Sequence, residues 1–399
     1  MNKHTTCDIF CNVIDNYGDI GVSWRLARQL ANENSLAVRL WVDDLGSFAR
    51  LCPEADVTSK VQQCRGVEVC LWIKNFPEVQ PADLVIEAFG CALPESYVVA
   101  MAAQQKSAWI NLEYLSAEDW VHGCHGLPSP HSRLPLTKYF FFPGFTKQTG
   151  GLLLERGLLA RRDTFQNDVA QQRGFWQSIG MEMPSAETLK ISLFGYENTA
   201  LRGLLDAWSG GSQPMLCLVP EGRILPQVGQ YFGDAASRVG KAYSQGNLQV
   251  RVLPFVEQER YDELLWACDV NFVRGEDSCV RAQWAGKPFV WQIYPQHDAV
   301  HWQKLQAFLN LYEASLSTAA RQAVQGLWQA WNNAGADGET TSTDSGQAWS
   351  AFAAARDELN RHAQNWGQQL VKNNLALNLL DFCQKIGKIR AFKIEGQQT

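Results

Sequence analysis

The chain has 399 residues, of which 46% are hydrophobic, and it carries a net charge of −6. This length is sufficient for two α/β domains, each with its own core. The negative charge argues against non-specific binding to nucleic acid or to anionic membranes, because both depend on clustered positive charge.

The first half of the chain alternates short apolar runs with helical segments. A helix is predicted at residues 22–33, where apolar side chains recur at near-helical spacing. Because strands that alternate with helices form parallel sheets with crossover connections, residues 1–160 are predicted to form a Rossmann-like domain. Its buried strands are predicted at residues 7–14, 36–42, 67–73, 84–89 and 108–114.

The second half repeats this architecture without repeating the sequence. A Gln-rich helical connector at residues 161–186 is predicted to lead into a second Rossmann-like domain at residues 187–370. Residues 332–346 are polar and rich in Gly, Ser and Thr, which favours a mobile surface loop. The strands of this domain are predicted at residues 189–194, 215–219, 250–253, 270–273 and 289–293.

Targeting signals and cysteine usage indicate a cytoplasmic protein. Asp8 and Asn12 interrupt the apolar segment near the start of the chain, so we expect no signal peptide. No run of about 18 apolar residues is present, so we expect no membrane span. The eleven cysteines form no CxxC pair, and we interpret them as reduced, mostly buried thiols.

The first candidate site follows the first predicted strand, in Asn12-Val-Ile-Asp15-Asn16-Tyr17-Gly18-Asp19. Open α/β sheets bind ligands at the carboxyl ends of their strands, so Asp15 and Asp19 are expected to project into such a crevice. The segment lacks G-x-G-x-x-G, which disfavours a nicotinamide oxidoreductase. The alternative is turn chemistry alone, with Asp19 as a helix N-cap and Asp15 bonded to local N–H groups.

The second candidate site lies at Arg274-Gly-Glu276-Asp277-Ser278, between two predicted strands. A turn at Gly275 is predicted to open a short helix with a Ser or Asp N-cap. The N-terminus of a helix offers free N–H groups and partial positive charge, which suit a diphosphate. This layout resembles the sugar-nucleotide site of GT-B glycosyltransferases. The alternative is a capped helix with solvated acids.

Other strand ends of the second half supply further candidates. Phe194 and Tyr196 follow one predicted strand, and Phe255 and Gln258 follow another. Phe255 is expected to pack on a base, Gln258 to hydrogen bond to the edge of that base, and Tyr294 to reach a phosphate through its hydroxyl. For the aromatic residues, the alternative is ordinary core packing.

The sequence favours no metal site. His122, Cys124, His125 and His131 lie close together in the chain, but their spacing fits no structural zinc pattern. We therefore interpret this segment as a loop and expect no metal. The chain also contains neither a G-x-S-x-G elbow nor a P-loop.

These segments together resemble the bacterial protein-arginine rhamnosyltransferases that modify translation elongation factor P, the EarP family. The resemblance spans essentially the whole chain, and its most specific part is the long block at residues 271–291. It is carried by Asp15-Asn-Tyr-Gly-Asp-Ile-Gly, Leu253-Pro-Phe-Val, Leu264-Leu-Trp-Ala-Cys-Asp, Asn271-Phe-Val-Arg-Gly-Glu-Asp-Ser and Gln283-Trp-Ala-Gly-Lys-Pro-Phe-Val-Trp.

The resemblance implies a fold and a reaction. The fold is α/β of the GT-B type, with two Rossmann-like domains facing each other across a cleft and a C-terminal helix, residues 371–399, packing back toward the N-terminal domain. The donor is dTDP-β-L-rhamnose on the C-terminal domain, and the acceptor is an arginine of elongation factor P on the N-terminal domain. The anomeric centre is inverted, and no metal or other cofactor is needed.

The resemblance also implies a role for each candidate residue. Asp15, Asp19 and Glu276 are the catalytically important acids. We assign Asp19 as general base, since a carboxylate can take a proton from the guanidinium as the C–N bond forms, and expect the other two acids to clamp the remaining N–H groups. The donor-binding residues are Phe194, Tyr196, Phe255, Gln258, Arg274, Asp277, Ser278 and Tyr294. The turn on the acceptor side comprises Asn12, Asn16, Tyr17 and Gly18.

The residues alone leave two alternatives open. Another GT-B sugar-nucleotide transferase or epimerase would keep the Ser278 site and lack the protein acceptor. A non-catalytic nucleotide-binding adaptor would use Asp15 and Asp19 as turn residues only.

Overall fold

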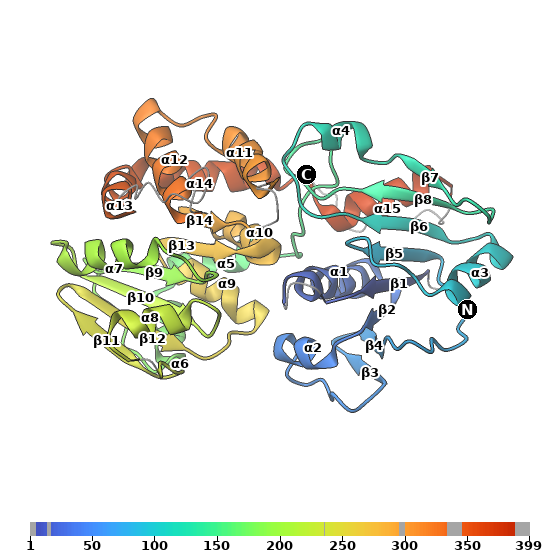
Figure 1. The fold of residues 1–399 in the computed structure, drawn as a ribbon, viewed down its shortest axis with the longest axis horizontal. Coiled ribbons are helices and arrows are strands. Elements are labelled where there is room, and N and C mark those ends of the chain that lie inside the picture. The colour runs from blue at the N-terminus through green and yellow to red at the C-terminus, as the bar shows by residue number, and fades with distance from the viewer. Residues whose placement is uncertain (1–4, 14–16, 235, 295–299, 333–344, 388–399) are drawn as a thin grey trace. The chain divides into compact units, whose positions relative to one another are not determined.

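The computed structural model describes residues 5–13, 17–234, 236–294, 300–332 and 345–387 (Figure 1). Two compact units share the chain. Unit 1 comprises Met1–Arg156 and Leu370–Thr399, and unit 2 comprises Gly157–Gln369. Each unit is built on one largely parallel sheet with crossover helices, so the predicted α/β fold with two Rossmann-like sheets is confirmed.

The sheet of unit 1 has the order β3-β4-β2-β1-β5-β6-β8-β7. Its strands are β1 (Thr6–Cys11), β2 (Ala37–Val42), β3 (Val61–Cys64), β4 (Val67–Leu71), β5 (Leu84–Ala88), β6 (Ala108–Leu112), β7 (Pro128–Pro130) and β8 (Thr137–Phe141). The edge strands β3 and β7 pair antiparallel with β4 and β8, and the other neighbours are parallel. The direction of winding reverses between β1 and β5, and open α/β sheets bind ligands at such a reversal.

The helices of unit 1 cover this sheet. They are α1 (Gly18–Asn34), α2 (Leu45–Leu51), α3 (Glu95–Gln104), α4 (Trp120–Cys124) and α15 (Leu375–Lys385). Helix α1 packs on β1, β2 and β4 through fully buried side chains such as Trp24 and Leu30, and it also contacts α15. The start of α15 is held by Asn374, whose Nδ2 donates to the carbonyl of Leu154 at 2.7 Å.

The sheet of unit 2 has the order β11-β12-β10-β9-β13-β14. Its strands are β9 (Leu189–Leu193), β10 (Met215–Pro220), β11 (Ala242–Gln245), β12 (Leu248–Leu253), β13 (Val270–Arg274) and β14 (Phe289–Gln292). Only β11, at one edge, pairs antiparallel among these described strands. The winding reverses between β9 and β13, which marks the second expected ligand-binding edge.

Helices pack against both faces of this second sheet. They are α5 (Leu158–Asn167), α6 (Val169–Ser178), α7 (Leu201–Gly210), α8 (Leu225–Tyr231), α9 (Gln258–Ala267), α10 (Gly275–Ala285), α11 (Val300–Tyr312), α12 (Thr318–Trp331), α13 (Ser345–Ala354) and α14 (Arg356–Leu370). The residues predicted as a connector form α5 and α6, which belong to unit 2. Helix α5 packs on α9 and α10, where Arg162 donates to the carbonyl of Trp284 at 2.8 Å.

The structure differs from the sequence prediction at several boundaries. Strand β1 ends at Cys11, three residues before the predicted end. Strands β3, β7, β8 and β11 were not predicted. The predicted loop at residues 332–346 lies largely outside the described residues, and Ser345 already begins α13. No helix in the described ranges combines the length and the apolar character needed to cross a membrane.

Candidate functional site

Asp19 lies in the first turn of α1 and is only 3% exposed. The N-cap position belongs to Tyr17, whose side chain makes no capping hydrogen bond. The alternative in which Asp19 caps the helix is therefore wrong, because Asp19 is the second residue inside it. A buried carboxylate is thus held where the chain leaves β1, at the positive end of α1.

The rest of the first candidate site lies only partly within the described residues. Asp15 and Asn16 fall outside the described residues, while Asn12, Tyr17 and Gly18 are half-buried between β1 and α1. The Oδ1 atom of Asn12 is buried and accepts no hydrogen bond from any described residue. A buried acceptor without a donor costs free energy, which a ligand carrying N–H groups would recover.

Two further features at neighbouring strand ends were missed by sequence reasoning. Asp43 follows β2, and its Oδ1 accepts the N–H of Val13 at 2.9 Å, which fixes the start of the turn. Phe89 follows β5 with φ of 57°, and its ring stacks on that of Tyr114 at 4.7 Å. Such a backbone costs about 1–3 kcal/mol in a residue with a side chain, and this strain is common at functional sites. Asp43 and Phe89 could have been found from the sequence by their position directly after the strands that flank β1, where ligands bind.

The junction of β13 and α10 forms the core of the second site. Helix α10 begins at Gly275, whose φ of 62° turns the strand into a helix within one residue. The predicted Ser or Asp N-cap is wrong, because Arg274 holds that position and no side chain caps the helix. Ser278 Oγ instead accepts the Arg274 N–H at 3.1 Å and donates to the Arg274 carbonyl. The first N–H groups of α10 have no partner within the helix, which suits an anion.

Arg274 is the cation at this junction. It is 7% exposed, and its Cζ lies 4.5 Å from the ring centroids of both Phe194 and Tyr196. Its buried Nε donates to none of the described residues, and no described carboxylate forms an ion pair with it. The two rings stabilise the cation, but a buried guanidinium without an anion still favours a negatively charged ligand.

Tyr196 is held by the end of β14. Its N–H donates to Gln292 Oε1 at 2.8 Å, and its ring meets that of Tyr294 edge-on at 5.6 Å. Tyr294 is 40% exposed. The exposed Arg223 places its Cζ 5.9 Å from the Tyr196 ring. The structure therefore brings the rings of the two candidates Tyr196 and Tyr294 into contact, and it places Gln292 and Arg223 beside Tyr196.

Asp277 is engaged by protein groups. Its Oδ2 accepts from Gln258 Nε2 and from Arg281 Nε, both at 3.1 Å. Arg281, whose side chain is 1% exposed, also donates to both carboxylate oxygens of Asp262, at 2.8 and 2.9 Å. Burial raises the pKa of the neighbouring Tyr261 hydroxyl, with a smaller contribution from Asp277. This network ties the start of α9 to α10.

Glu276 forms an ion pair that joins α10 to α11. Its Oε1 lies 3.3 Å from Lys304 Nζ, and the two side chains are 18% and 16% exposed. This contact could not be predicted from the sequence, because the spacing of the two residues matches no local motif. Phe255 lies half-buried in the loop between β12 and α9.

The histidines near α4 make local hydrogen bonds. His125 Nδ1 accepts the N–H of Phe142 at 3.1 Å, and burial lowers the pKa of His125. His122 Nε2 lies 3.0 Å from Thr146 Oγ1, and His131 Nδ1 accepts the N–H of Leu134 at 3.1 Å. These contacts order the loops that surround β7 and β8.

Comparison with known proteins identifies the family. The family model described as "Elongation-Factor P (EF-P) rhamnosyltransferase EarP" matches residues 7–384. The chain belongs to the EarP family. The protein-arginine rhamnosyltransferase of Pseudomonas putida is 53% identical over 380 residues, which cover 94% of this chain and 98% of that protein. Its counterpart from Pseudomonas aeruginosa is 49% identical over 377 residues, with the same coverage of both chains.

A solved structure supports the same EarP assignment. It is described as "Structural basis for EarP-mediated arginine glycosylation of translation elongation factor EF-P". It is 40% identical, covers 95% of this chain and 99% of its own, and superposes with a TM-score of 0.67. The resemblance predicted from the motifs is confirmed, and with it the GT-B fold.

Proposed function

We propose that this chain transfers L-rhamnose from dTDP-β-L-rhamnose to an arginine side chain of translation elongation factor P in the cytoplasm, with inversion and without a metal. Relatives at 53% and 49% identity are named protein-arginine rhamnosyltransferases, which supports the class of reaction. The observation that carries the donor half is the buried Arg274 between two aromatic rings at the start of α10.

The donor side must stabilise the negative charge that dTDP gains as it leaves. Arg274 and the first N–H groups of α10 are proposed to bind the diphosphate, with the Tyr294 hydroxyl as a further donor. The bond from Gln258 to Asp277 fixes the amide of Gln258, which we propose contacts the thymine edge beside Phe255. With these donors in place, the leaving group needs no divalent cation.

The acceptor side must make a poor nucleophile reactive. A guanidinium stays protonated, and its lone pairs are delocalised. In the proposed step a nitrogen of the arginine forms a bond to the anomeric carbon, the bond from that carbon to dTDP breaks, and Asp19 accepts the nitrogen's proton. Asp15, Glu276 and the buried Asn12 Oδ1 are proposed to accept the remaining N–H groups, which localises the reacting nitrogen.

The test mixes the full chain, dTDP-β-L-rhamnose and elongation factor P, and then measures the mass of the acceptor. A gain of one deoxyhexose on an arginine peptide, with the opposite anomeric configuration by NMR, is the expected result. Modification with a UDP-sugar in preference to dTDP-rhamnose, or turnover of the donor alone, would support another transferase or an epimerase instead.

A matched pair of variants tests the base. Asp19→Asn keeps the shape of the side chain and removes its basicity, so the transfer rate is expected to fall by about 10²–10⁴-fold. Asp44→Asn makes the same change at an exposed cap of α2, where Asn caps equally well, and is expected to keep the wild-type rate. A wild-type rate for Asp19→Asn would refute the assignment of the base.

A further inference from the structure

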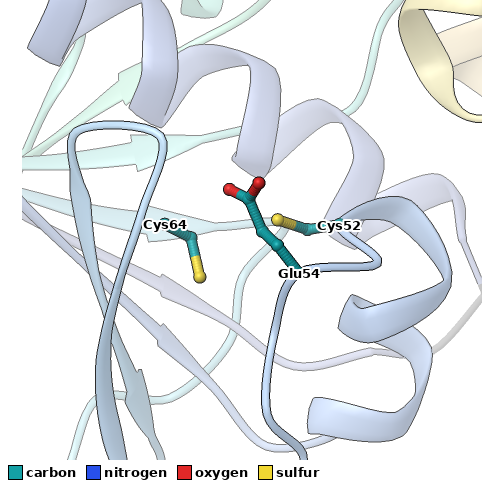
Figure 2. Close-up of side chains that lie close together, drawn as sticks. All are labelled: Cys52, Glu54 and Cys64. Carbon is teal, nitrogen blue, oxygen red and sulfur yellow. The ribbon is translucent and has the colours of Figure 1, made fainter.

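Cys52, Glu54 and Cys64 come together in unit 1, apart from every residue assigned above (Figure 2). The two sulfurs and a carboxylate oxygen all lie within 4.8 Å of one another. Both cysteines are buried, and Glu54 is exposed. We propose that this cluster binds a thiophilic divalent cation, of which Zn²⁺ is the representative.

Local structure brings the three ligands to one point. Cys52 directly follows α2, and its carbonyl accepts the N–H of Ala55 at 2.9 Å, so a tight turn carries Cys52 and Glu54. Cys64 is the last residue of β3. It is followed by a two-residue turn at Arg65 and Gly66, whose φ values of 46° and 85° suit a hairpin into β4. In Figure 2, Cys64 approaches from the hairpin, and the other two side chains approach from the loop after α2.

The loop and the hairpin are joined even without an ion. Gln62 on β3 donates from Nε2 to the carbonyl of Asp56 at 2.9 Å and accepts the Asp56 N–H at 2.8 Å. The same amide oxygen accepts the thiol of Cys64 at 3.6 Å. The positions of the ligands are thus fixed in advance, which reduces the entropy lost on binding.

The donor atoms fit a four-coordinate ion with one open position. Zinc accepts thiolate and carboxylate ligands, and bonds of about 2.3 Å at tetrahedral angles separate two sulfurs by about 3.8 Å. The two sulfurs, which lie within 4.8 Å of each other, are thus at most about 1 Å farther apart than the bound geometry requires. Two sulfurs favour Zn²⁺ over Mg²⁺ or Ca²⁺, which take oxygen ligands. A water molecule would complete the tetrahedron.

Binding of the cation would release the thiol protons and replace the ion pair between Glu54 and Arg65. A cysteine thiol is mostly protonated at neutral pH, so the ligand-free cluster holds two thiols. Each ion bound therefore releases two protons, and the affinity rises with pH. Glu54 also exchanges its contact with Arg65, at 3.5 Å and partly exposed, for the cation. The ion would then tie the loop after α2 to the edge of the sheet.

Cobalt tests the site in the reduced full-length protein, because Co²⁺ bound to thiolates absorbs in the near ultraviolet and in tetrahedral geometry also in the visible. Both bands are expected to saturate at one equivalent and to disappear when Zn²⁺ is added. Cys52→Ser and Cys64→Ser are each expected to weaken binding by at least about tenfold. Cys70→Ser is the matched control, because Cys70 is a buried thiol on β4 outside the cluster.

Glu54→Gln guards against a folding artefact, because Glu54 is exposed and its replacement disturbs no core packing. Zn²⁺ is expected to raise the melting temperature of the wild type more than that of this variant. The absence of thiolate bands, or wild-type affinity in both Cys52→Ser and Cys64→Ser, would overturn the proposal. Equal loss of affinity in Cys70→Ser would overturn it as well.

Discussion

Arg274→Met separates two effects of the buried guanidinium, its effect on the stability of the ligand-free protein and its proposed effect on the affinity for dTDP. In the ligand-free protein the substitution removes two stabilising cation–π contacts, worth about 0.5–2 kcal/mol each. It also removes the unfavourable desolvation of a buried guanidinium that has no described anionic partner. These effects oppose each other, so we expect little change in the melting temperature. With dTDP bound, the loss of a charged hydrogen bond costs about 1.5–3 kcal/mol. This predicts a Kd about 10- to 150-fold higher.

Calorimetric titration with dTDP measures this effect, because dTDP lacks the sugar and is not turned over. Arg223→Met is the matched control, since Arg223 is an exposed cation 5.9 Å from the same Tyr196 ring. An exposed contact contributes about 0.5–1 kcal/mol, so the Kd of this control should rise by no more than about fivefold. Wild-type affinity for dTDP in Arg274→Met, or a large fall in its melting temperature, would refute the proposed role.

Three further predictions concern stability, pH and metal dependence. Arg281→Met leaves the carboxylates of Asp262 and Asp277 without their shared cation, so the free energy of unfolding, measured in urea, should fall by about 3–5 kcal/mol. A loss below about 1 kcal/mol, which is the size typical of a single substitution, would contradict this prediction. Burial lowers the pKa of His125 and His362 from 6.5, so the unfolded chain binds more protons just below that pH. The contribution of these two histidines to the free energy of unfolding should therefore be present above pH 6.5 and be lost as the pH falls below 6.5 toward their lowered pKa values. Replacing both, in His125→Gln with His362→Gln, should flatten the curve of melting temperature against pH. EDTA should leave the initial rate of rhamnosyl transfer unchanged well below the melting temperature, whereas a loss restored by Mg²⁺ would contradict the proposed metal-free departure of dTDP.

The fold could be predicted because its central strands are buried on both faces. Strands such as β5 and β10 are almost entirely apolar, and a short apolar run between helices is a strong signal. The short edge strands gave no such signal. Most residues of β11 are exposed, and its conformation depends on antiparallel pairing with β12. Edge strands are defined by their partner, which local sequence does not reveal.

The candidate site could be predicted only to the level of position. Parallel strands expose their carboxyl ends at one edge, which is why candidates at the ends of β9 and β13, such as Phe194 and Arg274, lie close together. Individual contacts were not predictable, because pairs such as Glu276 with Lys304 depend on how α11 packs. The start of α10 was also misplaced, since only the backbone shows that Gly275 turns the strand directly into the helix.

The polar groups at the junction of β13 and α10 are of two kinds, those already bound to protein groups and those left to bind a ligand. Ser278 uses its hydroxyl both to accept from and to donate to the backbone of Arg274, so this hydroxyl braces the residue that precedes the helix. Asp277 Oδ2 accepts from Gln258 on α9 and from Arg281 on α10, so it links these two helices. Neither oxygen can turn to a phosphate without breaking these bonds. The carboxylates of Glu276 and Asp277 would also repel a diphosphate placed beside them. For the proposed departure of dTDP, we therefore expect the Arg274 guanidinium and the first backbone N–H groups of α10 to bind the diphosphate, with Ser278 and Asp277 holding those donors in place.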